Sequence, residues 1–211
     1  NFKLVDQVRF CEPELIALLT KAEHPVRNVV QNIADLKAQV AANEKGLAEL
    51  GKMIDQFGLD VVTAYMKHVQ DNAAESVSRV IDRLADSQFT YPMDQGCEIR
   101  VRITIDKPNR RVKVDFTGTS AQRDDNFNAP EPVTRAAVLY AFRVMVEDNI
   151  PMNAGCLRPI DIVVPQGTML SPQYPAAVVA GNVEVSQAVT NCLFGALGAM
   201  SAAQGTMNNF T

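Results

Sequence analysis

The apolar residues of this 211-residue chain change their spacing once, near residue 90, and this change constrains the fold more than any other feature. Between residues 32 and 84 they recur every three or four positions, the spacing of one face of an α-helix. Between residues 97 and 116 they alternate with polar residues, the spacing of a half-buried β-strand. The chain is therefore predicted to begin with helices and to continue into a sheet.

Two long amphipathic helices are predicted in the first part of the chain. The first ends at Phe57, and Gly58 is a suitable residue for its C-terminal cap. The sustained spacing of both helices predicts an antiparallel pair. The apolar positions are Ile33, Leu36, Val40, Leu47, Leu50, Ile54 and Phe57 in the first helix, and Val62, Tyr65, Met66, Val69, Ala73, Val77, Val80, Ile81 and Leu84 in the second.

The second part of the chain mixes strands and helices. Residues 97–105 and 112–116 alternate around a Pro-Asn turn and predict a β-hairpin. A helix over 133–146, a short strand between Pro159 and Pro165, and a last helix after Gly181-Asn182 follow. The predicted fold class is α+β, with an N-terminal antiparallel helical subdomain over residues 1–90. Residues 91–211 form the hairpin and mixed α/β region of a domain expected to be truncated at both ends.

Composition narrows the class of function. The net charge is -4 and the isoelectric point is about 5.2, so the chain lacks the basic surface that nucleic acids or anionic membranes require. No apolar run approaches the roughly 20 residues of a spanning helix, and no secretion leader opens the chain. The four cysteines are far apart and are expected to be buried thiols. These features indicate a cytoplasmic globular protein without nucleic-acid or membrane partners.

Short motifs for self-contained catalysis are missing from the sequence. It contains no phosphate-binding P-loop, no H-E-x-x-H zinc motif and no G-x-S-x-G nucleophile motif. His24 and His68 are expected to be surface or hydrogen-bonded residues rather than metal ligands. Asp124 and Asp125 share a polar loop, where a cation site and simple solvation are both open readings.

Junctions rich in asparagine and glycine precede the elements of the C-terminal half. Such residues serve turns and caps, or they place amides around a polar ligand. Asn182 is predicted to be the N-cap of the last helix, where free N–H groups attract an anion. Glu184 is either a residue that complements the helix dipole or a general base. Cys156 is either a small buried hydrophobe, the preferred interpretation, or a nucleophile beside Arg158.

Several long motifs, in one order, make the chain resemble the hydantoinase B/oxoprolinase family from about residue 28 to its end. Because they extend over most of the chain, the resemblance is more specific than any single short pattern. They are residues 31–43 (QNIADLKAQVAAN), 114–120 (VDFTGTS), 128–130 (NAP) with 133–135 (VTR), 150–160 (IPMNAGCLRPI), 175–184 (PAAVVAGNVE) and 204–209 (QGTMNN).

The resemblance implies part of a two-part, ATP-dependent enzyme. In this family an A-type half, fused or separate, binds ATP and phosphorylates a substrate carbonyl, and the B-type half completes the reaction. Members open 5-oxoproline to glutamate or open hydantoins, as N-methylhydantoinases do, while relatives carboxylate ketones. The expected function is hydrolysis of a cyclic amide. A ketone carboxylase subunit and a non-catalytic scaffold segment are the alternatives.

The resemblance also suggests site residues and cofactors. Asn153, Arg158, Asn182 and Asn208 are expected to bind the small-molecule substrate, and Glu184 is the expected catalytic residue. Arg158 would either clamp a carboxylate or pair with an acidic side chain. No cofactor is expected on this chain, because ATP with Mg²⁺, and a divalent metal, belong to other parts of such enzymes. The chain is expected to be inactive alone and to assemble with the A-type half in an oligomer.

Overall fold

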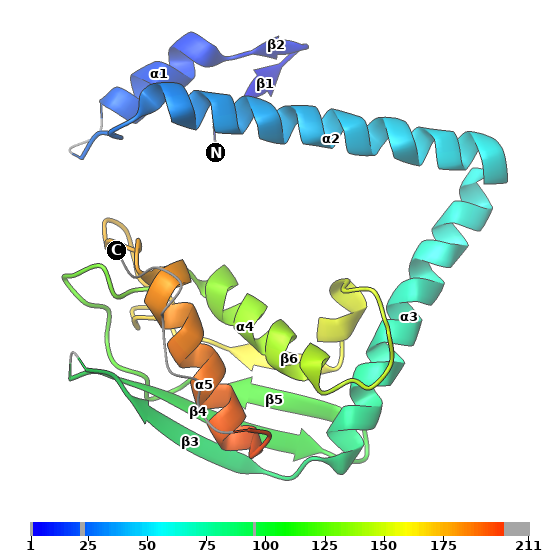
Figure 1. Cartoon of the computed structure of the whole chain (residues 1–211), viewed down its shortest axis with the longest axis vertical. Helices are drawn as coiled ribbons and strands as arrows, with labels where there is room; N and C mark the ends of the chain where they lie inside the picture. Colours follow the sequence, from blue (N-terminus) through cyan, green and yellow to red (C-terminus); the bar gives the residue numbers. More distant parts are fainter. Residues whose placement is uncertain (1, 22–23, 95, 201–211) are drawn as a thin grey trace. The chain divides into compact units, whose positions relative to one another are not determined.

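The computed structural model describes residues 2–21, 24–94 and 96–200, which form two compact units (Figure 1). Unit 1 spans Asn1–Ala64 and unit 2 spans Tyr65–Thr211. The division falls inside a helix, because the C-terminal half of that helix packs into the core of unit 2. The helical subdomain over residues 1–90 stays a prediction. The helices, strands and their order confirm the α+β class.

Unit 1 is built around one long helix, α2 (Val29–Phe57). The side chain of Asn28 caps its start by accepting a hydrogen bond from the N–H of Gln31 at 3.1 Å. Gly58 ends it as predicted, with φ at 84° and its N–H donating to the carbonyl of Ile54. The shorter elements of the unit are β1 (Val5–Asp6), β2 (Arg9–Phe10) and α1 (Glu12–Thr20), and α1 packs on the first turns of α2.

The next helix, α3 (Leu59–Arg83), begins in unit 1 and continues into unit 2. The antiparallel packing of α2 and α3 would join the two units, so it stays a prediction. Within unit 2, Ala73, Val77 and Ile81 of α3 are fully buried. These residues recur at the four-residue spacing of one helix face, as the sequence predicted.

Unit 2 contains a four-stranded sheet with the order β3-β4-β5-β6. The predicted hairpin is present, since β4 (Glu98–Asp106) and β5 (Arg111–Asp115) are antiparallel, with Ile103 opposite Val114. β6 (Ile160–Val163) pairs with β5 in parallel after a crossover through α4. β3 (Ser87–Pro92) pairs with β4 at the edge and was not predicted, because the alternation of Phe89 and Tyr91 with polar residues is short and ends at a proline.

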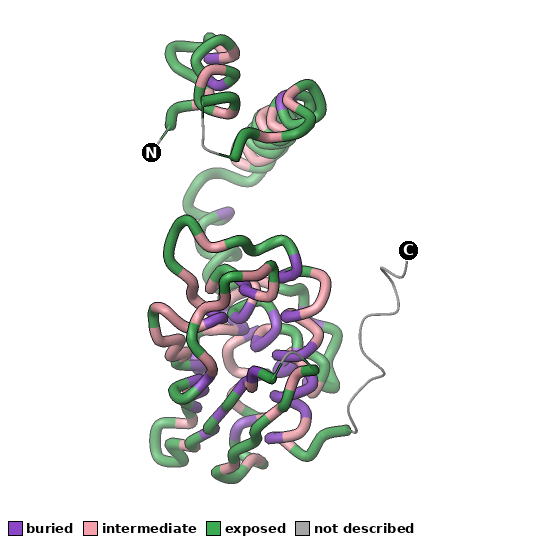
Figure 2. Tube along the Cα trace, turned by 90° about the vertical axis from the view of Figure 1, so that its left-hand side faces the viewer, coloured by how far each residue is buried: buried purple, intermediate pink, exposed green. Residues whose placement is uncertain are grey.

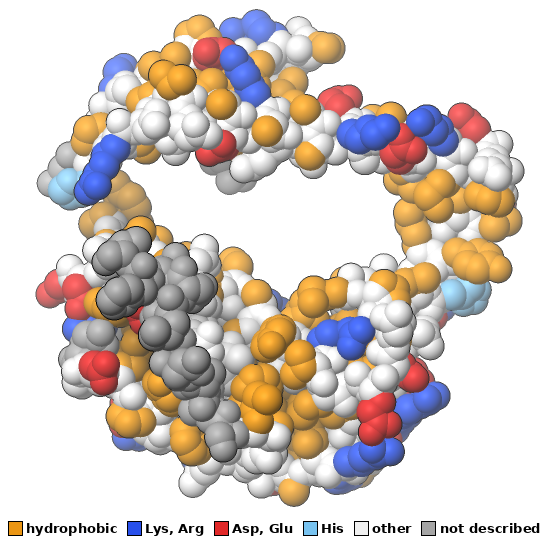
Figure 3. Space-filling model, in the orientation of Figure 1, with side chains coloured by type: hydrophobic (Ala, Val, Ile, Leu, Met, Phe, Trp, Pro, Cys, Tyr) orange, Lys and Arg blue, Asp and Glu red, His pale blue; other side chains and the backbone are white. Residues whose placement is uncertain are grey.

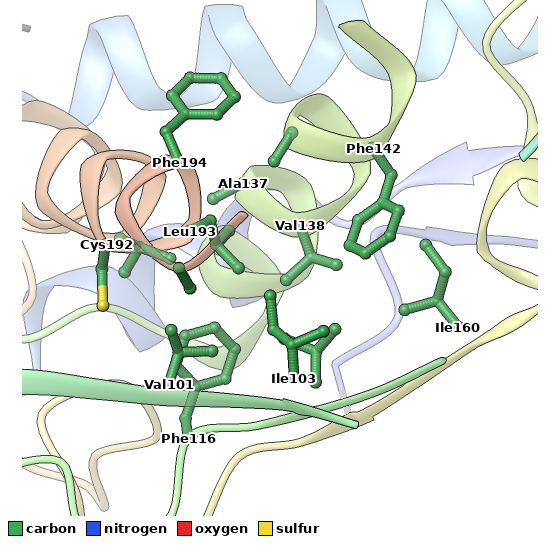
Figure 4. Close-up of a cluster of buried hydrophobic side chains, with 14 of the residues drawn as sticks. Val101, Ile103, Phe116, Ala137, Val138, Phe142, Ile160, Cys192, Leu193 and Phe194 are labelled. Atoms are coloured by element: carbon green, nitrogen blue, oxygen red, sulfur yellow. The ribbon is translucent and has the colours of Figure 1, made fainter. Parts of the chain in front are cut away.

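Helices α4 (Glu131–Val144) and α5 (Ser186–Leu197) lie side by side on one face of the sheet (Figure 1). Their apolar faces meet the inward side chains of the strands, as Figure 4 shows for Val138 and Leu193 above Val101 and Ile103. Figure 2 shows buried residues concentrated in this layer. The core of unit 2 thus lies between the sheet and two helices, with Ala73, Val77 and Ile81 of α3 added to it.

The hairpin turn is fastened to the end of α3 by two cations. The ammonium of Lys107 donates to the carbonyls of Asp82 and Leu84, both at 2.6 Å. The guanidinium of Arg110 contacts the carboxylates of Glu75 at 2.9 Å and Asp82 at 2.8 Å. Cations stabilise the negative end of a helix, so these contacts hold the turn against α3.

Candidate functional site

Asn128, in one of the asparagine-rich junctions, connects two loops that are far apart in the sequence. Its side chain is fully buried, and its amide nitrogen donates to the carbonyls of Arg123, Asp125 and Ala177 at 3.0, 3.0 and 2.9 Å. Its amide oxygen accepts from the N–H of Arg123 at 2.8 Å. The nitrogen and the oxygen of this amide are therefore both used, and the bond to Ala177 holds the 123–128 loop to the 171–180 loop.

Gly181 lies against the same junction. A Cβ on residue 181 would lie 2.9 Å from the carbonyl oxygen of Asn128 and 3.0 Å from the Cα of Ala129. The N–H of the preceding Ala180 donates to the carbonyl of Asn126 at 3.1 Å. Glycine is required here by close backbone approach, and this approach places the segment that leads into α5.

Asn182 and Glu184 lie together in the π-helical turn η2 (Gly181–Val185), directly before α5. The N–H groups of Glu184 and Val185 both donate to the carbonyl of Ala180, at 2.8 and 3.1 Å. Asn182 is exposed and Glu184 is half-buried. The predicted N-cap position of Asn182 is wrong, because the helical backbone already begins at Gly181, with Ala180 at the cap position.

A groove of about 560 Å³ runs between α4 and α5, and Asn182 lines one end of it. The residues that line it from α4 are mostly apolar, and those that line it from α5 are mostly polar. None of the described lining residues is charged, and Glu184 is not among them. The groove therefore suits a neutral group that accepts or donates hydrogen bonds. Its polar lining residues are Tyr140, Asn182, Ser186, Gln187, Thr190 and Asn191.

Asn153 lies at a different place, where the short 3₁₀ helix η1 (Ala154–Leu157) meets α3. Its side-chain oxygen accepts from the N–H of Gly155 at 2.8 Å, so it caps η1. Its amide nitrogen donates to the carbonyl of Pro151 at 3.0 Å. Both ends of this side chain are used locally, which is the turn-and-cap role that the sequence left open.

Arg158 follows η1 and forms an ion pair with α3. Its guanidinium contacts the carboxylate of Asp71 at 2.5 Å, and Lys67 contacts the same carboxylate at 3.2 Å. The hydrogen bonds from Arg158 and Lys67 lower the pKa of Asp71 below its usual value. Of the two roles predicted for Arg158, the structure shows pairing with an acidic side chain.

The structure brings the predicted site residues together in two pairs rather than one group. The turn η2, which contains Asn182 and Glu184, lies beside the start of α4, whereas η1, which Arg158 follows, contacts α4 toward its far end (Figure 1). A helix of 14 residues is about 21 Å long, so one small substrate does not reach both pairs. Asn208 lies outside the described residues.

The four cysteines are free and buried, as expected. Cys156 is fully buried, and its cationic neighbour Arg158 is paired with Asp71. Burial raises the pKa of Cys192 to about 12. These environments suit small buried hydrophobes rather than nucleophiles.

No group of three or more potential metal-binding side chains occurs within the described ranges. In the acidic loop, Asp125 is bound by the guanidinium of Arg123 at 2.5 Å, and this contact lowers the pKa of Asp125. His68 lies edge-on to the ring of Tyr65, with the ring centroids 5.9 Å apart. None of the helices described here is long and apolar enough to cross a bilayer.

Sequence reasoning did not identify the groove or the partners of the site residues. Asn182, Ser186 and Thr190 recur every four residues through η2 and α5, and this spacing was a usable signal for a polar stripe. The pairing of Asp71 with Arg158 had no such signal, because 87 positions separate the two residues.

The sequence of the chain is similar to one protein family and to several characterised members of it. Residues 1–211 match the model of the family described as hydantoinase B/oxoprolinase. The chain is 41% identical to 5-oxoprolinase 1 of Arabidopsis thaliana over its whole length, and 39% identical to 5-oxoprolinase of Saccharomyces cerevisiae over 88% of its length. It covers 18% and 15% of those two proteins, so it spans less than a fifth of either relative.

Two proteins are similar to the chain at lower sequence identity. The B-type subunit of a putative D-/L-hydantoinase from a Pseudomonas species (strain NS671) is 30% identical over 70% of the chain, which covers 28% of that protein. Among solved structures, the ATP-dependent caprolactamase from Pseudomonas jessenii matches with a TM-score of 0.72 at 20% identity. This match covers 96% of the chain and 35% of the caprolactamase chain, and it shows a shared fold.

Proposed function

Because this chain belongs to the hydantoinase B/oxoprolinase family, we propose that it is part of an ATP-dependent enzyme that hydrolyses 5-oxoproline to glutamate. The observation that carries the proposal is the extent of similarity. Identity to a 5-oxoprolinase extends over the whole chain, whereas identity to the D-/L-hydantoinase protein is lower and covers a part of it. A hydantoin is the second candidate substrate, supported by that weaker similarity.

The chemistry explains why such an enzyme uses ATP. A lactam is stabilised by amide resonance, and its oxygen is a poor leaving group. Transfer of the γ-phosphoryl group to that oxygen releases ADP and makes the ring carbon electrophilic. Water then adds to this carbon, and the C–N bond breaks while nitrogen takes the electron pair and a proton. A second water cleaves the resulting acyl phosphate, which gives glutamate and inorganic phosphate.

We assign the steps after phosphorylation to the B-type half and place the substrate at the start of α5. In this proposal the amide of Asn182 donates to the ring at the end of the uncharged groove. Glu184, two residues farther along the same turn and outside the groove lining, takes a proton from the attacking water. Asn153 and Arg158 hold η1 against α3, since their side chains already bind protein groups. The A-type half would supply the ATP and Mg²⁺ site and a larger oligomeric assembly in the cytoplasm.

The test uses the full-length protein that carries this chain, incubated with ATP and 5-oxoproline. Release of ADP and glutamate in equal amounts is the expected result. ADP release that depends on a hydantoin, with no glutamate formed from 5-oxoproline, would favour the second candidate. Turnover that requires a ketone and bicarbonate would replace the proposal with a carboxylase. The isolated 211-residue chain is expected to show no ATP-dependent turnover.

A further inference from the structure

The two side chains that the proposed function places at the substrate, Asn182 and Glu184, are not fixed by contacts of their own. In the described part of the chain, neither the Asn182 amide nor the Glu184 carboxylate forms a hydrogen bond or an ion pair. Glu184 is also the only charged residue in the range 162–211. Figure 3 shows hydrophobic side chains at the surface over α4, and no described residue that lines the groove is charged. The position of both side chains is therefore set by the backbone of the turn η2 that carries them.

The backbone of η2 is held by the loops that precede α4 and α5. The N–H of Ala180 donates to the carbonyl of Asn126 at 3.1 Å, and the N–H of Gly181 donates to the carbonyl of Val178 at 3.0 Å. The carbonyl of Asn128 lies against Gly181, where an added Cβ would be 2.9 Å from its oxygen. The turn is thus seated directly on the backbone of the asparagine-rich junction before α4.

Asn128 also binds the loop that leads into η2, through its side chain. The amide nitrogen donates to the carbonyl of Ala177 at 2.9 Å, three residues before Ala180. On its other side Asn128 is anchored in the core, since the N–H of Ala129 donates to the carbonyl of Met169 at 2.7 Å. Asn128, Ala129 and Met169 are all fully buried. One buried residue therefore connects the core to η2 by its carbonyl and to the preceding loop by its side chain.

We propose that Asn128 is a positioning residue for the hydrolytic step. It does not contact the substrate, but it fixes η2 so that Asn182 and Glu184 meet the phosphorylated lactam in one geometry. The inference rests on the proposed function. Reacting groups need such support, because a displacement of about 1 Å costs on the order of 100-fold in rate. Since neither site side chain has a partner among the described residues, this precision has to come from the backbone beneath them.

In the proposed reaction ATP is consumed before Glu184 acts, and this order gives the inference a specific signature. When water attacks the ring carbon slowly, the phosphorylated lactam reacts with water at phosphorus instead. That attack forms a bond from phosphorus to the water oxygen and breaks the bond from phosphorus to the ring oxygen. The ring nitrogen takes up a proton, and the lactam returns with inorganic phosphate. ADP then forms without glutamate, whereas loss of folded enzyme lowers both products by the same factor.

The first test measures the ADP and glutamate that variants of the full-length enzyme form from ATP and 5-oxoproline. Asn128→Ala is expected to lower the kcat for glutamate by about 10- to 100-fold and to raise the ratio of ADP to glutamate above that of the parent. Gly181→Ala disturbs the same contact without changing the amide, so it is expected to do the same and carries the test if Asn128→Ala does not fold. Gly155→Ala is the matched control, because it strains a close contact at η1 and is expected to keep the ratio of the parent.

A double-mutant cycle then separates positioning from stability. Residues that act as a unit lose less together than the product of their separate losses, whereas independent losses multiply. The glutamate rate of the Asn128→Ala/Glu184→Gln variant is therefore expected to exceed that product by at least about fivefold. The Asn128→Ala/Gly155→Ala variant is the control pair, and its losses are expected to multiply.

Hydrogen exchange gives a readout that needs no substrate. The N–H groups of Glu184 and Val185, both bound to the carbonyl of Ala180, are expected to exchange faster in Asn128→Ala and Gly181→Ala but not in the control. Exchange at η2 like that of the parent, an unchanged product ratio in both variants, or multiplying losses in the cycle overturns the inference. A parent that forms no glutamate from 5-oxoproline overturns the proposed function instead, and the product ratio is then measured with the hydantoin or ketone that it converts.

Discussion

Gly155 lies directly against the backbone of Gln70, so that a Cβ on residue 155 would lie 2.7 Å from both the Cα and the carbonyl carbon of Gln70. This close approach packs η1 against α3 and allows two further contacts between the two segments. Asn153 reaches the carbonyl of Val69 at 3.5 Å, and Arg158 reaches Asp71. The contact between these segments, which are more than 80 residues apart in the sequence, thus requires a glycine at position 155.

Gly155→Ala is therefore expected to lower the free energy of unfolding by about 1–3 kcal/mol, the range for overpacking a close contact. Backbone atoms of α3 cannot move aside as a flexible side chain can. Urea denaturation of the variant and the parent measures the effect. Ala154→Ser adds one heavy atom at the exposed neighbouring position and is expected to change the free energy by less than about 0.5 kcal/mol. Equal effects of the two substitutions would contradict this account.

Asn128→Ala is expected to destabilise the protein by about 1–3 kcal/mol, because it leaves buried backbone groups without their hydrogen bonds. The loop at Ala177 loses its connection to the 123–128 loop and should exchange its amide hydrogens faster. Hydrogen exchange and urea denaturation together measure both effects. Asn126→Ala is the control, since the side chain of Asn126 is exposed and only its carbonyl is used, by Ala180.

Glu184→Gln tests the catalytic assignment in the full-length enzyme. Loss of a general base is expected to lower kcat by about 10²–10⁴-fold, with the melting temperature unchanged. Asn182→Ala is expected to lower kcat/KM by about 5- to 10-fold, the equivalent of one neutral hydrogen bond. The same Asn126→Ala variant controls for a general effect of changing this region. If both site variants retain full turnover, the scaffold alternative becomes the better description of this segment.

The ion pairs of Arg110 are expected to make the stability of the protein depend on pH. Its hydrogen bonds lower the pKa values of Glu75 and Asp82. The unfolded values lie near 4, so this stabilisation is complete above about pH 5 and is lost as the pH falls through the lower folded values. Arg110→Ala should therefore melt at a lower temperature than the parent at pH 6, and the difference should shrink toward pH 2.

The neighbouring Arg111 gives a matched control for that measurement. Arg111 is exposed and has no ion-pair partner among the residues that the structure describes. Arg111→Ala removes the same charge and is expected to leave the melting temperature nearly unchanged at both pH values. A pH-independent loss in Arg110→Ala would instead point to lost packing of the hairpin turn on α3.

The regular elements were predictable because their signals are local. The four-residue spacing of α3, the alternation of β4 and β5, and the glycine that ends α2 each act within a few positions of the chain. The family was predictable for a related reason, since its long motifs can be read in order along the chain. The edge strand β3 had a weaker signal, because its alternation around Phe89 and Tyr91 is short and its place depends on pairing with β4.

The candidate site depended on contacts that no local pattern encodes. The sequence singled out Asn153, Arg158, Asn182 and Glu184 as residues of one site, and it placed Asn182 at a helix cap. The tertiary structure decided that α4 separates the two pairs and that Gly181 starts the helical turn earlier. Periodicity follows from the geometry of one element, whereas these arrangements follow from how closely distant backbones approach. The sequence by itself therefore determined the elements and the family, and packing between distant segments determined which side chains share a surface.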